Sequence, residues 1–277
     1  MENKLPIFSF FCISIVLYTK IDGIGAKPPS KIIGGEDVLI EEFPSVILIY
    51  MDDYHLCGGT LITNKHVVTA AHCVVYQPEN STTYTEEYYP EELLVCGGSS
   101  DTGNFSHCLE VETINVHEDY TGDPDSDYEH DITILTLISE IPVSSKLKPI
   151  NLPSKNTYAG EVGTILGWGY TSVNGSLSTT LKGTQTIVQD TLKCEPMRKT
   201  QLCVANGCGV GFCDGDSGGP LIIDDEIVGV ISSSIGCATG SPDYLTRVYS
   251  YLDWIHNIIE PNLETNELES SNELQHC

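Results

Sequence analysis

Basic side chains are scarce in this sequence. Its 277 residues include 13 Lys and Arg against 39 Asp and Glu, which gives a formal net charge of −26. Proteins that bind nucleic acids or anionic membranes neutralise phosphate groups with Lys and Arg. The charge therefore argues against a general affinity for either, and we expect no nucleic acid and no membrane among the partners.

Long apolar segments are lacking after the first twenty residues. The one such run covers residues 5–18, follows Lys4 and precedes small residues at positions 23–26. A positive start, an apolar core too short to span a bilayer and a small-residue cleavage zone are typical of a secretory signal peptide, whereas a signal anchor needs a longer run. We predict a signal peptide over residues 1–23 and a soluble, secreted, extracellular mature protein.

Cysteine, in contrast, is abundant. Cys12 belongs to the predicted signal, which leaves ten of the eleven cysteines for the mature chain. Disulfides persist in oxidising compartments, so this number agrees with secretion. Three Asn-x-Ser/Thr sequons add candidate glycosylation sites at Asn80, Asn104 and Asn174.

Short apolar segments separated by turn residues dominate the chain from Ile32 onward. Buried strands are predicted at 46–50, 59–62, 132–135 and 227–231. This spacing favours an all-β barrel or sandwich. Residues 76–92, rich in Glu and Tyr, are predicted to form a long surface loop.

One helix is expected near the end of the chain. Apolar residues recur at steps of three and four between Tyr251 and Ile259, which gives one apolar face. The chain then becomes rich in Glu and Asn, so residues 260–277 are predicted to be a disordered acidic tail.

The segment over residues 215–220, Gly-Asp-Ser-Gly-Gly-Pro, has the composition of a nucleophile loop. A serine that attacks an amide needs a base to take its proton, a carboxylate to orient that base, and donors for the oxyanion. Gly215 allows close backbone approach, so the N–H groups of Gly215 and Ser217 can point at one oxygen. We therefore expect an oxyanion hole at these two residues.

Two further motifs precede this loop. They are Thr-Ala-Ala-His-Cys over residues 69–73 and Asp-Ile-Thr-Ile-Leu over residues 131–135, in the order His, Asp, Ser. Together the three motifs resemble the chymotrypsin-like serine peptidase family over residues 32–259, as do Gly-Trp-Gly at 167–169 and the helix that carries Trp254. The resemblance implies two antiparallel six-stranded β-barrels with a C-terminal helix and the active site in the cleft between the barrels. It makes Ser217 the nucleophile, His72 the general base and Asp131 the orienting carboxylate; His130 is expected to be only a neighbour of the site.

The sequence Lys-Ile-Ile-Gly-Gly over residues 31–35 resembles the activation site of the same family. The resemblance implies a propeptide over residues 24–31 and an activating protease that cuts after Lys31. The new ammonium group of Ile32 would then pair with Asp216.

Disulfide pairs follow from the same resemblance. It implies Cys57–Cys73, Cys213–Cys237 and Cys194–Cys203, and adjacent strands suggest Cys96–Cys108 as a fourth pair. Cys208 and Cys277 remain. They could pair with each other or between chains, or Cys208 could replace Cys203 as the partner of Cys194.

The substrate pocket resembles that of the crab-collagenase (brachyurin) subgroup. Gly211 occupies the position of the pocket-base Asp of trypsin-like members, and Asp243 stands where most members have Gly. This exchange favours a broad or basic preference for the residue before the cleaved bond, the P1 residue. An ordinary solvated carboxylate is the alternative for Asp243.

Other pocket positions depart from the family pattern. Phe212 is bulky where the family has a small residue, Ser233 stands in place of an aromatic residue and Ser234 in place of Gly. Asp214 adds negative charge at the entrance. The predicted pocket residues are Gly211, Phe212, Asp214, Ser232, Ser234 and Asp243.

No residue spacing indicates a metal site or a cofactor. Expected partners are protein or peptide substrates and the activating protease, with a proteinaceous inhibitor as a possible further partner. The altered pocket leaves one alternative open, a catalytically silent homologue that acts as a binding or regulatory protein. The acidic charge does not distinguish a narrow processing enzyme from a general digestive or venom-type protease.

Overall fold

The computed structural model describes residues 32–52, 54–76, 86–122, 128–173, 175–194 and 197–260. The predicted signal peptide, the predicted propeptide and all of the predicted tail except Glu260 lie outside these residues. So do the sequons at Asn80 and Asn174. No helix in the described ranges has the length and apolar character needed to cross a membrane.

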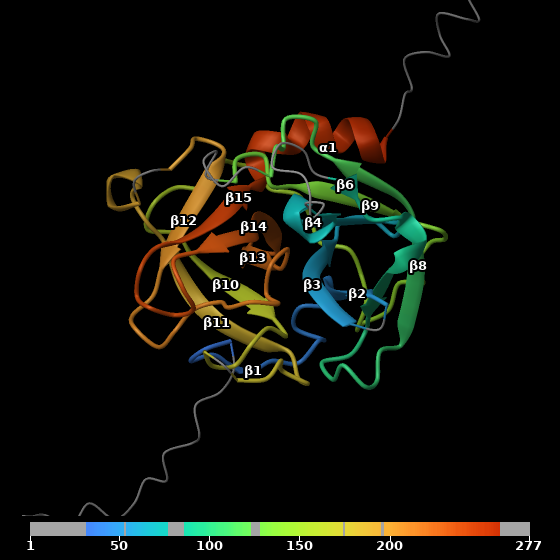
Figure 1. Cartoon of the computed structure of the whole chain (residues 1–277), viewed down its shortest axis with the longest axis horizontal. Coiled ribbons are helices and arrows are strands. Elements are labelled where there is room, and N and C mark those ends of the chain that lie inside the picture. The colour runs from blue at the N-terminus through green and yellow to red at the C-terminus, as the bar shows by residue number, and fades with distance from the viewer. Residues whose placement is uncertain are drawn as a thin grey trace, which may run out of the picture.

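The first half of the chain forms a closed antiparallel barrel (Figure 1). Around the barrel, the strands follow the order β2 (Val46–Met51), β3 (Tyr54–Leu61), β4 (His66–Thr69), β9 (Thr133–Leu137), β8 (His107–Val116) and β7 (Leu93–Gly97). Branched apolar side chains such as Ile47, Val67 and Ile134 are fully buried inside it. Burial of these β-branched residues on a pleated surface explains why the segments form strands.

The second half forms another antiparallel barrel. Its strands follow the order β10 (Val162–Gly167), β13 (Pro220–Ile223), β14 (Glu226–Ser234), β15 (Asp243–Arg247), β12 (Gln201–Ala205) and β11 (Lys182–Val188). The pairing of β12 with the end of β11 closes the barrel, and the short strand β1 (Glu36–Asp37) pairs with the first two residues of β11. Two six-stranded barrels and few helices confirm the predicted all-β fold class.

The C-terminal helix packs on the first barrel. After the turn η5 (Val248–Tyr251), helix α1 (Leu252–Ile259) buries Ile255 completely against the core of that barrel. Tyr251 is buried in the same cluster, as the predicted apolar face requires. The helix thus ties the end of the second half of the chain to the first half.

The predicted surface loop over residues 76–92 is more regular than expected. Strand β6 (Glu86–Glu87) pairs with β5 (Val75–Tyr76), and the turn η2 (Pro90–Glu92) follows. The Tyr76 hydroxyl donates to Glu86 at 2.8 Å, and its ring stacks on Tyr88. Polar composition alone did not reveal these contacts, so the prediction of one long loop was wrong for residues 86–92.

Four disulfides join the expected partners: Cys57–Cys73, Cys96–Cys108, Cys194–Cys203 and Cys213–Cys237. Cys208 is an exposed free thiol whose Sγ lies 3.1 Å from the Thr239 carbonyl oxygen. It does not replace Cys203 as the partner of Cys194. Cys277 lies outside the described residues, so its pairing with Cys208 stays a prediction.

Candidate active site

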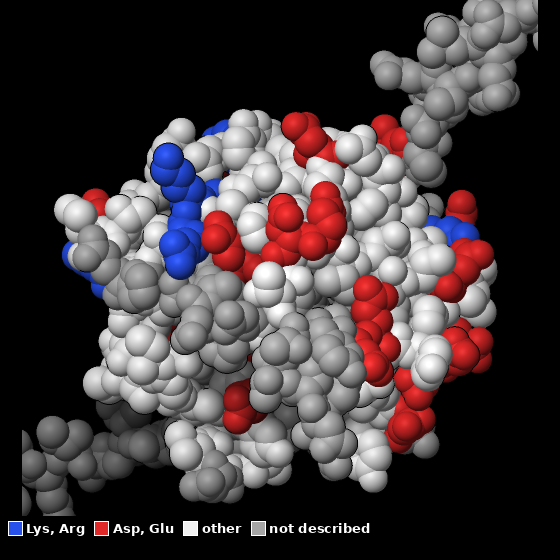
Figure 2. All heavy atoms as spheres, turned by 45° about the horizontal axis from the view of Figure 1, so that its top comes forward, with Lys and Arg blue, Asp and Glu red and all other residues white. Residues whose placement is uncertain are grey.

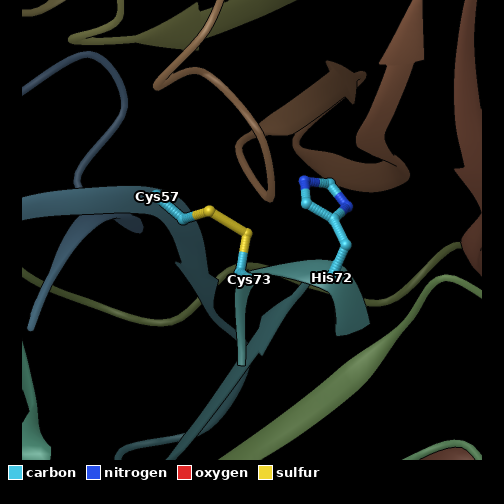
Figure 3. Close-up of side chains that lie close together, drawn as sticks. All are labelled: Cys57, His72 and Cys73. Carbon is cyan, nitrogen blue, oxygen red and sulfur yellow. A yellow bond between two sulfur atoms is a disulfide. The ribbon is translucent and has the colours of Figure 1, made fainter. Parts of the chain in front are cut away.

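His72 lies on a short turn at the end of a barrel strand. Strand β4 ends at Thr69, and the turn η1 (Ala71–Cys73) buries Ala71 and Cys73 while leaving His72 with 26% of its side chain exposed. The disulfide from Cys73 to Cys57 on β3 anchors this turn beside the imidazole (Figure 3). The backbone therefore presents His72 toward the cleft from a rigid base.

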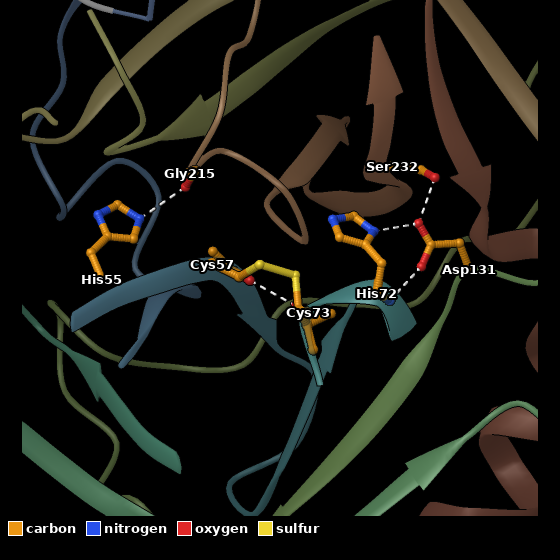
Figure 4. The surroundings of a disulfide bond; sticks show 9 residues. His55, Cys57, His72, Cys73, Asp131, Gly215 and Ser232 are labelled. Carbon is orange, nitrogen blue, oxygen red and sulfur yellow. Dashed lines mark hydrogen bonds and ion pairs between the residues drawn. A yellow bond between two sulfur atoms is a disulfide. The ribbon is translucent and has the colours of Figure 1, made fainter. Parts of the chain in front are cut away.

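Asp131 holds His72 through two hydrogen bonds. Its Oδ2 lies 2.8 Å from Nδ1 of His72, and its Oδ1 accepts the His72 backbone N–H at 2.9 Å (Figure 4). The bond to Nδ1 places a proton there and leaves Nε2 as the free acceptor nitrogen. The pair thus has the geometry of an oriented general base.

The second barrel completes the environment of Asp131, which is fully buried. Ser232 on β14 donates its hydroxyl to Oδ2 at 2.5 Å, and Thr246 on β15 donates to the Asp131 carbonyl at 2.7 Å. Ser232 was predicted as a pocket residue; it also donates this hydrogen bond to Asp131. Sequence reasoning missed Thr246, because nothing in a strand pattern links it to a residue so distant in the chain.

The two ionisable groups shift each other's pKa. Burial disfavours the charged imidazole of His72, but the negative charge and hydrogen bond of Asp131 outweigh it and raise the pKa of His72. Burial also opposes ionisation of Asp131, yet the contacts with His72 and Ser232 lower the pKa of Asp131. Each group therefore favours the charged form of the other.

Glycines shape the loop that carries Ser217. Gly215 and Gly218 have φ of 85° and 77°, values that favour glycine. A Cβ at Gly218 would lie 2.1 Å from Oγ1 of Thr69, so a side chain has no room there. The Ser217 carbonyl accepts the N–H of Gly58 at 2.8 Å, which fixes the loop against the first barrel.

Ser217 and His72 line the same cleft, of about 330 Å³. The backbone N–H groups of Gly215 and Ser217 have no acceptor among the described residues.

A second histidine, His55, restrains the serine loop: its Nε2 lies 2.9 Å from the Gly215 carbonyl oxygen (Figure 4). Burial lowers the pKa of His55, while the bond to Gly215 acts in the opposite direction. No role was predicted for His55. Only its position two residues before Cys57, which was expected to brace the His72 turn, pointed to a place near the site.

Asp216 is completely buried beside the serine. Its carboxylate accepts the backbone N–H of Gly169 at 2.8 Å and that of Cys213 at 3.0 Å. Burial raises the pKa of Asp216 to about 7 despite these bonds. No cationic side chain pairs with it in the described part of the chain.

Ile32, the first described residue, is also fully buried. It packs in the core of the second barrel, and the following residue, Ile33, pairs with Gly211. The φ of Ile32 is 38°, which is unfavourable for a β-branched residue. Lys31 lies outside the described residues.

The predicted pocket residues fall into two groups. Phe212, Asp214, Ser232 and Ser234 line the cleft together with His72, Tyr128, Cys213, Ser217 and Ser233. Gly211 and Asp243 do not line it. Sequence reasoning also missed Tyr128, because its loop has no motif.

Asp243 lies beside Gly211 and does not line the cleft. A Cβ on Gly211 would lie 3.2 Å from Oδ2 of Asp243, so a side chain at this position would crowd the carboxylate. Asp243 is 5% exposed and has no hydrogen-bond partner for its side chain within the described ranges. Burial raises its pKa to about 7. The alternative of a solvated loop carboxylate is therefore wrong.

Comparison with known proteins agrees with this arrangement. The trypsin family model matches residues 32–255. Chymotrypsin-2 of Vespa crabro is 33% identical over 229 residues, covering 81% of this chain and 98% of the relative. A snake venom serine protease of Crotalus durissus durissus is 31% identical over 86% of this chain and 91% of the relative, and trypsin beta of Drosophila erecta is 29% identical over 85% and 91%. Because the family model spans both barrels, and with them the residues that form the His–Asp pair and the serine loop, this chain belongs to the trypsin family of serine proteases.

Proposed function

We propose that this protein is a secreted serine endopeptidase, made as a zymogen and activated by cleavage after Lys31. One observation carries the proposal: a buried carboxylate orients His72 in the same cleft that Ser217 lines. That arrangement matches the chemistry of acyl transfer to a serine.

The reaction uses each group in turn. His72 Nε2 takes the proton from Ser217 Oγ as the oxygen attacks the peptide carbonyl, and Asp131 stabilises the resulting imidazolium. The N–H groups of Gly215 and Ser217 receive the oxyanion, a contact of the kind whose loss costs about 10²–10³ in rate. His72 then gives its proton to the leaving amine, and water hydrolyses the acyl-enzyme by the same steps.

Activation rests on the buried carboxylate of Asp216. A fully buried carboxylate without a cation is unfavourable, and removing one partner of a buried ion pair costs about 3–5 kcal/mol. Cleavage after Lys31 supplies an ammonium group at Ile32, whose side chain is already buried in the second barrel. Cleavage also relieves the unfavourable φ of Ile32. The new ion pair would hold the loop that contains Gly215 and Ser217.

Asp243 is the proposed determinant of P1 preference. Its buried, unpaired carboxylate would favour a Lys or Arg side chain that reaches it. Phe212 lies on the cleft side and limits this access, which leaves apolar P1 residues acceptable. A broad preference with a basic component follows.

Secretion is supported by the four disulfides and by the predicted signal peptide. Asn104 is exposed, as glycosylation would require, and its side-chain amide donates to Asp101 at 2.9 Å. Protein substrates follow from family membership, whereas the activating protease and an inhibitor remain part of the proposal.

The first prediction concerns Ser217. Protein cleaved after Lys31 should hydrolyse a peptide library, and Ser217→Ala should lower kcat by at least about 10⁴-fold because the nucleophile is lost. Mass spectrometry of the products identifies the cleaved bonds. Equal activity in the Ser217→Ala protein, or none in a verified cleaved wild-type protein, contradicts the proposed function; the latter result favours a binding role.

The second prediction concerns pH. His72 acts as a base only when neutral, so kcat/KM should rise with pH through a pKa above the ordinary value for histidine. In Asp131→Asn the burial of His72 remains without the compensating charge, so its pKa should fall below that value. NMR titration of the imidazole measures both. Ser232→Ala keeps the charge and is the control; an unchanged His72 pKa in Asp131→Asn would refute the coupling.

The third prediction concerns activation. Lys31→Ala should leave a folded protein that resists the activating cleavage, and its activity should be about 10²–10⁴-fold below that of the cleaved wild type. Asp216→Asn should stay equally inactive after verified cleavage, since an amide cannot form the ion pair. Lys31→Arg, which keeps a basic cleavage site, is the matched control. Full activity in uncleaved Lys31→Ala protein would overturn the zymogen mechanism.

The fourth prediction concerns specificity. Asp243→Gly should lower cleavage after Lys and Arg, relative to Leu and Phe, by about tenfold or more, because a charge-assisted contact is lost. Phe212→Ser should raise the same ratio by opening the way to Asp243. Asp214→Asn removes an exposed carboxylate at the cleft mouth and should have a small effect. A ratio unchanged in Asp243→Gly would show that Asp243 does not select substrates.

A further inference from the structure

Two histidines stack outside the cleft, directly beside the segment that carries Asp131. His117 follows β8, and His130 immediately precedes Asp131. Their ring centroids lie 4.9 Å apart, with 16° between the planes. Tyr251 contacts both rings, and its hydroxyl lies 3.1 Å from Nδ1 of His130. Trp254 lies against His117, with ring centroids 5.0 Å apart.

Asp119 completes a set of metal-binding groups. One ligand atom from each of His117, Asp119 and His130 lies within 4.8 Å of the others. Two other clusters in the described part of the chain have similar spacing, but each includes two cysteines already joined in a disulfide. The two histidines and Asp119 are therefore the set whose donor atoms are available.

We propose that His117, His130 and Asp119 bind a divalent transition-metal ion such as Zn²⁺, and that the bound ion lowers peptidase activity. Two imidazoles and a carboxylate are ligands that Zn²⁺ accepts, and water can fill a fourth position. The activity part of this inference rests on the proposed function; the binding part does not.

Closing on an ion requires one imidazole to turn. A Zn–N bond of about 2.0–2.1 Å lies in the plane of its imidazole, whereas the planes of His117 and His130 are stacked with 16° between them. One ring therefore has to rotate for the three ligand atoms, now within 4.8 Å of one another, to converge on the ion. Asp119 is exposed and His130 is partly exposed, so both side chains have room to turn. His117 Nδ1 accepts the Asp119 backbone N–H at 3.2 Å. This long bond is lost when the ion binds. If Nδ1 binds the ion, its lone pair is used; if Nε2 binds the ion, the neutral ring carries its proton on Nδ1, and Nδ1 can no longer accept.

The surroundings favour a cation. Tyr251 would hold the His130 ring as an outer-shell partner of the kind that orients metal-bound histidines. Acidic side chains also outnumber basic ones over the face shown in Figure 2, and the whole chain has a formal charge of −26. This field raises the local concentration of cations.

An ion at this site would act on the proposed catalytic groups through the backbone. His117 and His130 stand at the two ends of the segment that carries Tyr128, which lines the cleft. The N–H of His117 donates to the Ile132 carbonyl, and that of Ile132 donates to the His130 carbonyl at 2.7 Å. Drawing the two rings together would displace the peptide next to Asp131. Catalytic groups tolerate displacements of only about 0.5 Å, so kcat should fall.

Binding is tested without catalysis. An untagged Ser217→Ala, Cys208→Ser, Cys277→Ser protein, which lacks both cysteines outside the four disulfides of the mature chain, is titrated with Co²⁺ while tryptophan emission is recorded, and excess Zn²⁺ is then added. The chain has two tryptophans, and Trp168 is fully buried, so quenching should report Trp254 beside His117. We expect saturable quenching that Zn²⁺ reverses.

The decisive variant is His130→Asn. Its φ of 61° suits asparagine, so the fold should survive, and circular dichroism checks this. We expect its Co²⁺ affinity to fall at least about tenfold, since a ligand is lost. His107→Gln, which alters a histidine at the far end of β8, should bind like the parent. An equal affinity in His130→Asn and the parent would overturn the site.

Activity is tested separately on cleaved protein with an intact Ser217. Zn²⁺ should lower kcat for a small neutral peptide with little change in KM, EDTA should reverse this, and His130→Asn should abolish the effect. Inhibition that persists in His130→Asn would place the ion elsewhere, for example on His72, and overturn the coupling, as would binding without inhibition. A protein with no activity at all would contradict the proposed function, yet the fluorescence titration would still decide the metal site.

Discussion

The buried carboxylate of Asp131 is the contact on which the rest of the site depends. It lies in the first barrel, but Ser232 and Thr246 of the second barrel donate to its side chain and its carbonyl. A buried charge is tolerated only when hydrogen bonds replace its hydration. The hydrogen bonds of Asp131 therefore join the two barrels, and they orient His72 at the same time. The same contacts stabilise the interface between the barrels and position the proposed base.

Three carboxylates are buried in the described part of the chain, and they differ in how many hydrogen bonds they accept. Asp131 accepts bonds from His72 and from Ser232, and its pKa is lowered. Asp216 has two backbone donors and Asp243 has no side-chain partner in the described ranges, and burial raises the pKa of each to about 7. A carboxylate that the fold itself satisfies performs a fixed role. One that the fold leaves without a cation is suited to a partner that arrives later, and we propose a new chain end for Asp216 and a substrate side chain for Asp243.

Local signals predicted much of the fold. The apolar runs of the barrel strands and the periodic residues of α1 appear where they were expected, because burial on one face leaves a short repeat in the sequence. The surface segment at 86–92 was missed, since its order comes from a tyrosine pair and from strand pairing with β5 rather than from composition. His55, Tyr128 and Thr246 were missed for a related reason: each acts through a partner or a cleft that no local pattern encodes.

The sequence by itself determined the family, the all-β class, the residues to place in the reaction and the expected disulfide partners, because the motifs around them are local and their residue types are chemically specific. Only the tertiary structure decided that Phe212 lines the cleft while Asp243 does not, and that His117 stacks on His130. These relations join residues on different strands and loops. Their distances depend on strand register and barrel closure, which are set by the summed packing of both cores.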